Sequence, residues 1–481
     1  MYRHSSEKYG KEIGPLRIRL VMLQNSIYIS IGVGLLTNTV VSSVFDTKNF
    51  AKENIITRDV AVVGGGASGT YAAINLRELG TSVVVVEKEN VLGGHTNTYT
   101  DPTTGITVDY GVQAYLNSTI TLDFFAHFNV PVVGYSASPV SIEPADFKTG
   151  ETVKFNPSED LKPWAQQLAK YPWLDATWDI PQPVPADLLL PFGEFIVKYN
   201  LTNLAYYIYF SASGLSNPLQ ELTINVMKMV DQAYVDESKG GGLGTANHDN
   251  SEIYVKALAE LGSSALLSST VIATSRLVNN SGVRLVVKTP SGCKLIEAKK
   301  LLITIPPTLG NMKPFALNVQ ETNIFSQFTY MGYYTILLNN TGLPSGYEWI
   351  NANDSSSTYN IPDLPGACQI IETRISGMFY AWYRSPLNMT QQEVEASTIA
   401  AIQNLQKAGN YTATTPTVVE YRSHTPFKLR VSAEAISNGF YEELYALQGK
   451  RSTWYTGAAM VSHNAGVIWN FTHALLPDLV G

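Results

Sequence analysis

The sequence predicts an α/β fold in which a Rossmann-type dinucleotide-binding domain is interleaved with an α+β substrate domain. Residues 59–69, DVAVVGGGASG, are a short β-rich apolar run that ends in the pattern G-x-G-x-x-G. Residues 70–86 continue with a helical pattern and then four valines, so strand, helix and strand follow one another as in a βαβ unit. The chain has 481 residues, of which 45% are hydrophobic, and this length indicates two domains woven together.

The helix of the βαβ unit is predicted from residues 70–80, TYAAINLRELG, because their apolar side chains recur on one helical face. Residues 83–86, VVVV, then form a second strand that is buried on both sides, as strands of parallel sheets are. The apolar face of the expected helix consists of Ala72, Ala73, Leu76 and Leu79.

The three glycines of the pattern each have a separate task. Gly64 allows the tight turn after the first strand, and Gly66 lets the backbone approach a pyrophosphate at the helix N-terminus. Gly69 lets helix and strand pack closely. Ala67 and Ser68 lie between these glycines, so they are candidate contacts of the same phosphates.

Glu87 follows the second strand directly. An acid in this place accepts a hydrogen bond from a ribose hydroxyl and disfavours a 2′-phosphate, so NADP is not expected. A second glycine turn follows, which a nicotinamide dehydrogenase does not need, whereas the pyrophosphate and ribityl chain of an extended FAD require further backbone contacts. The sequence therefore predicts FAD as the cofactor. The candidate contacts in this stretch are Glu87, Lys88, Gly93, Gly94, His95 and Thr96.

These motifs, together with EKENVLGGHTNT (87–98) and VDYGVQ (108–113), resemble the flavin-containing amine oxidase superfamily. The resemblance implies an amine-oxidase-like two-domain flavoprotein, with the Rossmann-type FAD-binding domain interleaved with the substrate domain. In that superfamily an arginine usually follows the glycine pair, and this chain has His95 there. An arginine contact to the phosphates is therefore not expected.

The resemblance continues along the chain. Residues 298–315, AKKLLITIPPTLGNMKPF, resemble the strand and turn where the superfamily's chain passes from FAD domain to substrate domain. Residues 267–276, LSSTVIATSR, resemble the segment whose backbone contacts the adenine, and residues 453–467, TWYTGAAMVSHNAGV, resemble the closing flavin motif. The family often has an acid after the first glycine of that motif, where this chain has alanine. The implied FAD contacts are Val271, Gly457 and Ala458.

Residues 188–201, LLLPFGEFIVKYNL, and 441–457, YEELYALQGKRSTWYTG, resemble a subgroup with bacterial polyunsaturated fatty acid double-bond isomerases and fungal β-cyclopiazonate dehydrogenase. The similarity covers roughly residues 53–481 and implies an FAD-dependent oxidoreductase that abstracts hydride from a C–H bond of an apolar secondary metabolite. A double-bond isomerase of fatty acids and an amine oxidase are the alternatives. A flavin-fold binding protein without chemistry is a third interpretation, since His95 and Ala458 depart from the family's pattern.

Amine oxidases usually carry a lysine near flavin N5 on the strand after the IPPTLG turn. The matching stretch here, YMGYYTILLNN (330–340), has Thr335 and Ile336 around that position and no lysine. The sequence therefore predicts that the reduced flavin reacts weakly with oxygen.

Four residues beside flavin motifs are candidates for orienting the substrate against the flavin. Gln113 and Tyr115 follow VDYG, and Trp454 and Tyr455 precede TGAA. Each has a plain packing role as its alternative. Gln113 is the first to mutate.

The predicted domains alternate along the chain. Residues 150–235 show helical patterns, and residues 325–430 show alternating strands. GGGLG (240–244) is a turn back to the FAD domain, either a flexible loop or a flavin contact. The FAD-binding domain is expected at 54–145, 235–312 and 445–481, the substrate domain at 146–234 and 313–444, and an N-terminal extension at 1–50.

Composition excludes some functions. A net charge of −7 and a pI near 5.6 argue against nucleic acid as a partner, and the seven histidines have no metal-ligand spacing along the chain, so no metal is expected. The expected partners are an apolar small-molecule substrate and an unknown electron acceptor. Cys293 and Cys368 are expected to be unpaired, with one disulfide as the alternative. No cysteine adjoins the closing motif, so covalent FAD attachment through cysteine is not expected.

Residues 20–45 are a long uncharged apolar stretch, and small residues near its end suit a signal cleavage site. Either Met1 or Met22 is the physiological start. Passage through the secretory pathway is predicted, with an uncleaved N-terminal membrane anchor as the alternative. The sequons that support it are Asn117, Asn200, Asn279, Asn339, Asn353, Asn388, Asn410 and Asn470.

Overall fold

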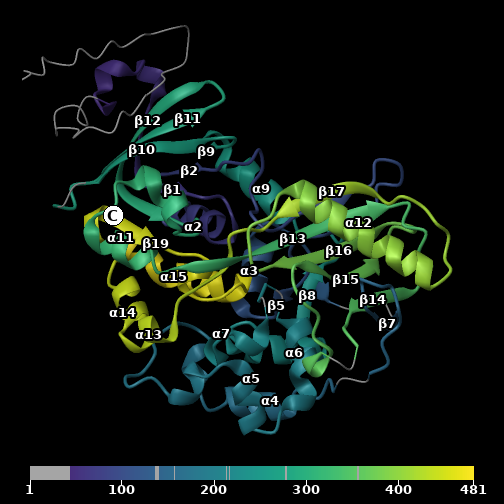
Figure 1. Ribbon diagram of the computed structural model, residues 1–481. Helices are drawn as coiled ribbons and strands as arrows, with labels where there is room; N and C mark the ends of the chain where they lie inside the picture. Colours follow the sequence, from purple (N-terminus) through teal and green to yellow (C-terminus); the bar gives the residue numbers. More distant parts are fainter. Residues whose placement is uncertain are drawn as a thin grey trace, which may run out of the picture.

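The computed structural model describes residues 44–135, 140–155, 158–212, 214–215, 217–276, 279–354 and 357–480. Two large mixed sheets lie beside one another, with a helical region below them in the view of Figure 1. Segments far apart in the sequence build each sheet, because the chain crosses between them several times.

The first sheet contains the predicted βαβ unit. β1 is parallel to both β2 and β12, and α2 connects β1 to β2. The strand order is β10-β11-β12-β1-β2-β9, and β19 pairs with β12. The bounds are β1 Ile55–Val63, α2 Ala67–Glu78, β2 Val83–Val86, β9 Ala265–Leu266, β10 Thr270–Arg276, β11 Val283–Thr289, β12 Gly292–Ile303 and β19 Thr453–Tyr455.

Burial confirms most of the pattern predicted for this unit. All four valines of β2 are buried, as are Ala72, Ala73 and Leu76 of α2. Leu79 was expected on the same face, and this prediction is wrong. The helix ends at Glu78, so Leu79 lies beyond the last helical turn and its side chain is 55% exposed.

Four helices cover one face of this sheet. Val60 and Val62 of β1 pack in one cluster with Tyr71 of α2, Phe124 of α3 and Trp469 of α15. The helices are α2, α3 Thr119–His127, α9 Glu252–Leu261 and α15 Ala465–Leu479. This packing fixes the N-terminus of α2, where the glycine pattern lies.

The second sheet has the order β17-β13-β16-β15-β14-β7, with β18 paired to β13, and confirms the strands expected in residues 325–430. β7 pairs into this sheet although it lies inside the first segment predicted for FAD binding. The bounds are β7 Ser141–Ala145, β13 Thr329–Asn339, β14 Tyr347–Asn351, β15 Gly366–Glu372, β16 Phe379–Ser385, β17 Thr417–Ser423 and β18 Phe427–Arg430.

α12, Gln391–Ala408, covers one face of the second sheet (Figure 1). Tyr334 and Ile336 of β13 pack against Val394 and Ile402 of this helix. Because side chains alternate along a strand, Tyr333 and Thr335 lie on the opposite face. Tyr333 on that face contacts the rings of His424 and Phe427, which pack against His95 after the second glycine turn, as described below.

The helices expected in residues 150–235 are present. They pack against the other face of the first sheet, opposite α2, in one core that includes Trp164 and Phe192. Their bounds are α4 Lys162–Leu168, α5 Phe192–Lys198, α6 Ala205–Ser211, α7 Thr223–Met227 and α8 Gln232–Asp236. Further helices are α10 Leu309–Met312, α11 Val319–Phe325, α13 Ala433–Ser437 and α14 Phe440–Tyr445.

GGGLG is ordered rather than a flexible loop. Gly240 and Gly241 end a π-helical turn, η7 (Glu237–Gly241), and the rest forms β8. β8 pairs with β5 and β6 in a small antiparallel sheet. The remaining strands are β3 Thr98–Thr100, β4 Thr107–Asp109, β5 Tyr115–Leu116, β6 Val132–Gly134 and β8 Gly242–Thr245.

The N-terminal signal or anchor prediction falls almost wholly outside the described residues. Among those that are described, no helix is both long and apolar enough to cross a membrane, and no group of three potential ligand residues could hold a metal ion. Seven of the eight sequon asparagines are exposed, and Asn353 is half-buried. Cys293 and Cys368 are both free thiols. The secretory route and the domain boundaries stay predictions.

Candidate functional site

The first glycine turn leaves the N-terminus of α2 open. Gly64 has a φ of +105°, which favours glycine. A Cβ on Gly69 would lie 1.9 Å from the Gly64 carbonyl oxygen, so helix and strand pack too closely for a side chain. Gly66 is the N-cap residue, and no side chain caps the helix. The first backbone N–H groups of α2 are therefore available to a bound phosphate.

The second glycine turn packs directly against the first. The Gly93 N–H donates to the Gly65 carbonyl over 2.8 Å. Gly94 has a φ of +60°, and a Cβ there would lie 3.0 Å from the Gly66 Cα. We call Gly64–Gly66, Gly69, Gly93 and Gly94 the glycine cradle. The cradle has no side chains at the place where the pyrophosphate of a dinucleotide must approach the backbone. These residues therefore fit FAD.

The Glu87 side chain hydrogen-bonds the backbone of the glycine cradle. Its side chain is 7% exposed, and its Oε2 accepts from the Gly65 N–H over 2.6 Å while Oε1 accepts from the Glu89 N–H over 2.8 Å. Each carboxylate oxygen can accept a second hydrogen bond, so a ribose hydroxyl can still bind. The bond to Gly65 was not anticipated from the sequence. Glu87 therefore shapes the turn in addition to offering a ribose contact.

The segment before Val271 lies beside Glu87. The Glu87 N–H donates to the Leu266 carbonyl, and the Ser269 N–H donates to the Glu87 carbonyl. This adjacency suits the adenosine half of FAD. Lys88, by contrast, is exposed and forms an ion pair with Glu89.

His95 lies between the two halves of the molecule. Its ring is 4.5 Å from that of His424 and 5.7 Å from that of Phe427, both from the substrate side. Burial lowers the pKa of His95 to about 4. The ring is therefore neutral near pH 7, and the positive charge of the family's usual arginine is missing here.

The motif VDYG is joined to the second glycine turn. The Val112 N–H donates to the His95 carbonyl, and a Cβ on Gly111 would lie 2.1 Å from that same oxygen. Thr96, next to His95, is buried. The two motifs are therefore one structural unit.

Three of the seven histidines gather around Phe427, although they are scattered along the sequence. The His463 ring is 4.0 Å from that of Phe427, and its Nε2 accepts from the Lys428 N–H. His424 Nε2 lies 3.2 Å from Thr335 Oγ1. Burial, together with neighbouring charged groups, lowers the pKa of both His424 and His463 well below the usual value. The cluster therefore packs as neutral rings, and sequence spacing gave no sign of it.

The closing motif lies beside the N-terminus of α2. Gly457 has a φ of +106°, and a Cβ there would lie 3.0 Å from the Thr304 carbonyl and 3.5 Å from Ser68 Oγ. Ala458 follows and is half-buried. The first turn, the IPPTLG turn and the closing motif thus converge from three parts of the sequence.

Of the four candidates for substrate orientation, only Gln113 reaches the opposite sheet. Its Oε1 accepts from the Tyr135 hydroxyl over 3.2 Å and its Nε2 donates to the Asp109 carbonyl. Its side chain also lies next to the hydroxyl of Tyr380 of β16. Gln113 therefore holds two tyrosines at the junction of the domains.

The contacts of the other three are those of packing. Tyr115 is 1% exposed and packs against Phe125 and Trp469. The Tyr455 hydroxyl hydrogen-bonds Glu321 and Arg276 inside the protein, and Trp454 lies near Lys300. A structural role in packing, the alternative to orienting the substrate, accounts for the contacts of these three residues.

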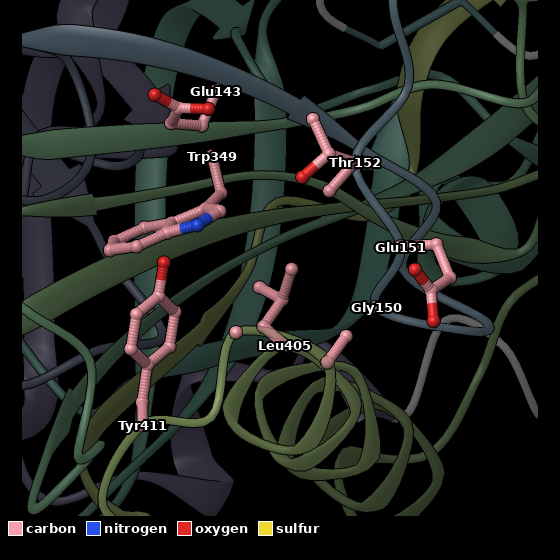
Figure 2. Close-up of a pocket in the computed structure, with 10 residues that line it drawn as sticks. Glu143, Gly150, Glu151, Thr152, Trp349, Leu405 and Tyr411 are labelled. Carbon is pink, nitrogen blue, oxygen red and sulfur yellow. The ribbon is translucent and has the colours of Figure 1, made fainter.

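Two cavities lie away from the glycine cradle. Figure 2 shows the smaller, about 70 Å³, between Glu143, Thr152, Trp349, Leu405 and Tyr411. A second, of about 600 Å³, opens beside α3 and β6. Neither is lined by a cradle residue, and the first is too small for a flat multi-ring substrate.

Replacing Gly94 by alanine should weaken FAD binding by tenfold or more, because the methyl group would crowd Gly66 in the cradle and the backbone would be strained. Gly105→Ala is the matched control. Its φ is +72°, but nothing lies within 4 Å of the added Cβ. FAD occupancy after dialysis measures the difference. Equal occupancy in the two variants would show that the cradle does not meet the cofactor.

Comparison with known proteins decides the family. Residues 62–128 match the model of an NAD(P)-binding Rossmann-like domain. The FAD-dependent oxidoreductase pigF of Monascus ruber is 41% identical over 444 residues, covering 91% of this chain and 95% of that protein. The chain belongs to this family of FAD-dependent oxidoreductases. β-Cyclopiazonate dehydrogenase of Aspergillus oryzae is 33% identical over 440 residues, covering 88% of this chain and 93% of that protein.

Solved structures show the fold of this FAD-dependent oxidoreductase. The fatty acid isomerase of P. acnes that produces CLA has a TM-score of 0.69 at 18% identity, covering 88% of this chain and 98% of its own. Putrescine oxidase has a TM-score of 0.64 at 14% identity, covering 88% and 99%. The predicted family, the amine-oxidase-like two-domain fold and FAD as cofactor are confirmed.

Proposed function

We propose that this FAD-dependent oxidoreductase removes hydride from a C–H bond of an apolar small molecule, a flat secondary metabolite. The observation that carries it is the aromatic face of the second sheet. Tyr333 of β13 and Tyr380 and Trp382 of β16 lie on the side opposite α12, and the Tyr380 and Trp382 rings are 4.9 Å apart. Flat apolar molecules pack well on such rings.

The same face meets the cofactor side of the molecule. Tyr333 contacts the rings of His424 and Phe427, and His424 and Phe427 contact His95 after the glycine cradle. A substrate on the aromatic face therefore lies next to the residues that would hold FAD. FAD supplies the hydride-accepting chemistry when bound.

The protein's own residues orient the substrate and exclude water. The cradle and the N-terminus of α2 would hold the pyrophosphate, Glu87 a ribose, and Gly457 and Ala458 the flavin half. Gln113 fixes Tyr135 and Tyr380 at the edge of the aromatic face. The relative named β-cyclopiazonate dehydrogenase supports dehydrogenation as the reaction.

Anaerobic titration of the purified holoprotein tests the proposal. We expect β-cyclopiazonate, the molecule in the name of that relative, to bleach the flavin absorbance, and linoleate and putrescine to leave it unchanged. Conversion of linoleate to a conjugated isomer, without lasting bleaching, would instead identify an isomerase. Bleaching by putrescine would identify an amine oxidase. A purified protein that neither carries nor binds FAD would favour the third interpretation, a protein with the flavoenzyme fold that catalyses no reaction.

The reduced flavin is expected to reoxidise slowly in air. At the place where amine oxidases have a lysine, β13 carries Thr335, whose hydroxyl is paired with a neutral His424, so no lysine assists oxygen there. The neighbouring cation, Arg422 of β17, donates to the Tyr110 hydroxyl instead. Stopped-flow mixing of dithionite-reduced protein with oxygenated buffer measures the rate. Free FAD is the reference, and peroxide formation as fast as that of putrescine oxidase would contradict the expectation.

A further inference from the structure

Glu237 is a half-buried acid at a junction of the proposed substrate side and the closing flavin motif. It begins the π-helical turn Glu237–Gly241, directly after α8. π-Helical turns are rare and are frequent at functional sites. Glu237 was not among the residues that the sequence singled out.

The surroundings of Glu237 come from two motifs. A Cβ on Gly242 would lie 3.7 Å from Glu237 Cγ, 3.7 Å from Tyr135 Cβ and 3.8 Å from Ala114 Cβ. Ala114 follows Gln113, and Tyr135 is the hydrogen-bond partner of Gln113. On the other side, the Asn464 side chain of the closing motif lies close enough to the Glu237 carboxyl to act on its pKa. Glu237 thus lies near Gln113 and next to the flavin motif.

One oxygen of this carboxyl has no partner. Oε1 of Glu237 is buried and makes no hydrogen bond to any residue that the structure describes. A buried acceptor without a partner destabilises the folded state by about 1–3 kcal/mol. A buried acceptor without a partner calls for an explanation. A bound molecule that donates a hydrogen bond to Oε1 would provide that explanation.

The electrostatic setting favours proton exchange. Burial, and then the charge of Asp231, raise the pKa of Glu237 to about 7, while the Asn464 side chain opposes the shift. The charged and titratable groups that face it are Asp231, the N-cap residue of α8, and Tyr234 of α8. Glu237 can therefore take up and release a proton near neutral pH, as a general base must.

We infer that Glu237 is the catalytic base that accepts the substrate's proton during dehydrogenation. The inference rests on the proposed function, since hydride removal alone leaves a cation that must lose a proton. The substrate's C–H bond breaks, and its hydrogen and electron pair go to FAD, which is reduced. The neighbouring X–H bond, where X is carbon, nitrogen or oxygen, gives its proton to the Glu237 carboxylate, and a C=X double bond forms.

Anaerobic single-turnover bleaching of holoprotein by β-cyclopiazonate tests the inference in wild type, Glu237→Gln and Asp236→Asn. Gln keeps the size of the side chain but cannot accept a proton. Asp236 is the exposed neighbouring acid and serves as the matched control. FAD content and melting temperature, measured on each variant, separate lost chemistry from lost folding.

We expect the bleaching rate of wild type and Asp236→Asn to rise with pH through a value of about 7, because the base must be ionised. Glu237→Gln should retain FAD, bleach at least ~100-fold more slowly and lose this pH dependence. If wild type bleaches and Glu237→Gln matches its rate and pH profile, Glu237 is not the base although the proposed function holds. If β-cyclopiazonate, linoleate and putrescine all fail to bleach wild type, the proposed function fails and this inference with it.

Discussion

Glu87→Ala should purify largely without FAD. The substitution removes a carboxylate that can accept from a ribose hydroxyl, and a charge-assisted hydrogen bond contributes about 1.5–3 kcal/mol. FAD affinity should therefore fall about tenfold to a hundredfold. The loss should lie toward the upper end, because the same change leaves the Gly65 N–H without its acceptor and loosens the glycine cradle itself.

FAD occupancy after extensive dialysis and the melting temperature both measure this effect. The melting temperature falls because bound FAD stabilises the folded state by mass action. Glu89→Gln is the matched control, since the Glu89 side chain is exposed and only its backbone N–H contacts Glu87. If Glu87→Ala keeps stoichiometric FAD, the adenosine ribose does not lie at this carboxylate.

Glu321→Gln should lower the free energy of unfolding by about 3–5 kcal/mol, the usual loss when one partner of a buried ion pair is removed. Glu321 is 2% exposed. It accepts from both Nη atoms of Arg276 over 2.6 and 3.0 Å, from Arg451 over 2.8 Å and from the Tyr455 hydroxyl over 2.8 Å. These contacts join α11 to β10 and β19. The change would leave two guanidinium groups facing a neutral amide.

The ion pair between Glu321 and Arg276 should also make the stability of the folded protein depend on pH. Burial alone would raise the pKa of Glu321, but hydrogen bonding to Arg276 and its charge outweigh burial and lower it from the usual 4.5. The ionised carboxylate therefore stabilises the fold above pH 4.5, and this contribution is lost as the pH falls through the lowered pKa. The difference between wild type and Glu321→Gln should shrink in the same range.

Urea unfolding of the holoproteins at pH 7 and at acidic pH measures both effects. Glu443→Gln, an exposed acid on α14, is the control and should change stability by no more than ~0.5 kcal/mol. A Glu321→Gln variant as stable as this control at pH 7 would show that the buried pair does not hold α11 to the first sheet.

Local patterns determined what lies close together in the sequence. The glycine spacing, the helix after it and the four valines predicted the βαβ unit because turn geometry and burial on both faces act within a few residues. α12 was missed although Thr390 and Glu393 form a capping box at its start, a signal that the sequence carries. Leu79 was wrongly assigned to the buried helical face because the helix ends one residue earlier, at Glu78, and a pattern of apolar residues does not show where the last turn stops.

The site beyond the cradle was decided by tertiary structure. His95, His424 and His463 meet around Phe427 only because the cradle, β18 and the closing motif pack together. The same long-range packing puts Tyr115 and Tyr455 in the core and buries Oε1 of Glu237. By itself, the sequence determined the dinucleotide fold, FAD and the family, since these rest on backbone geometry in contiguous motifs. Which side chains face the substrate depends on contacts between distant segments, and no local pattern encodes those.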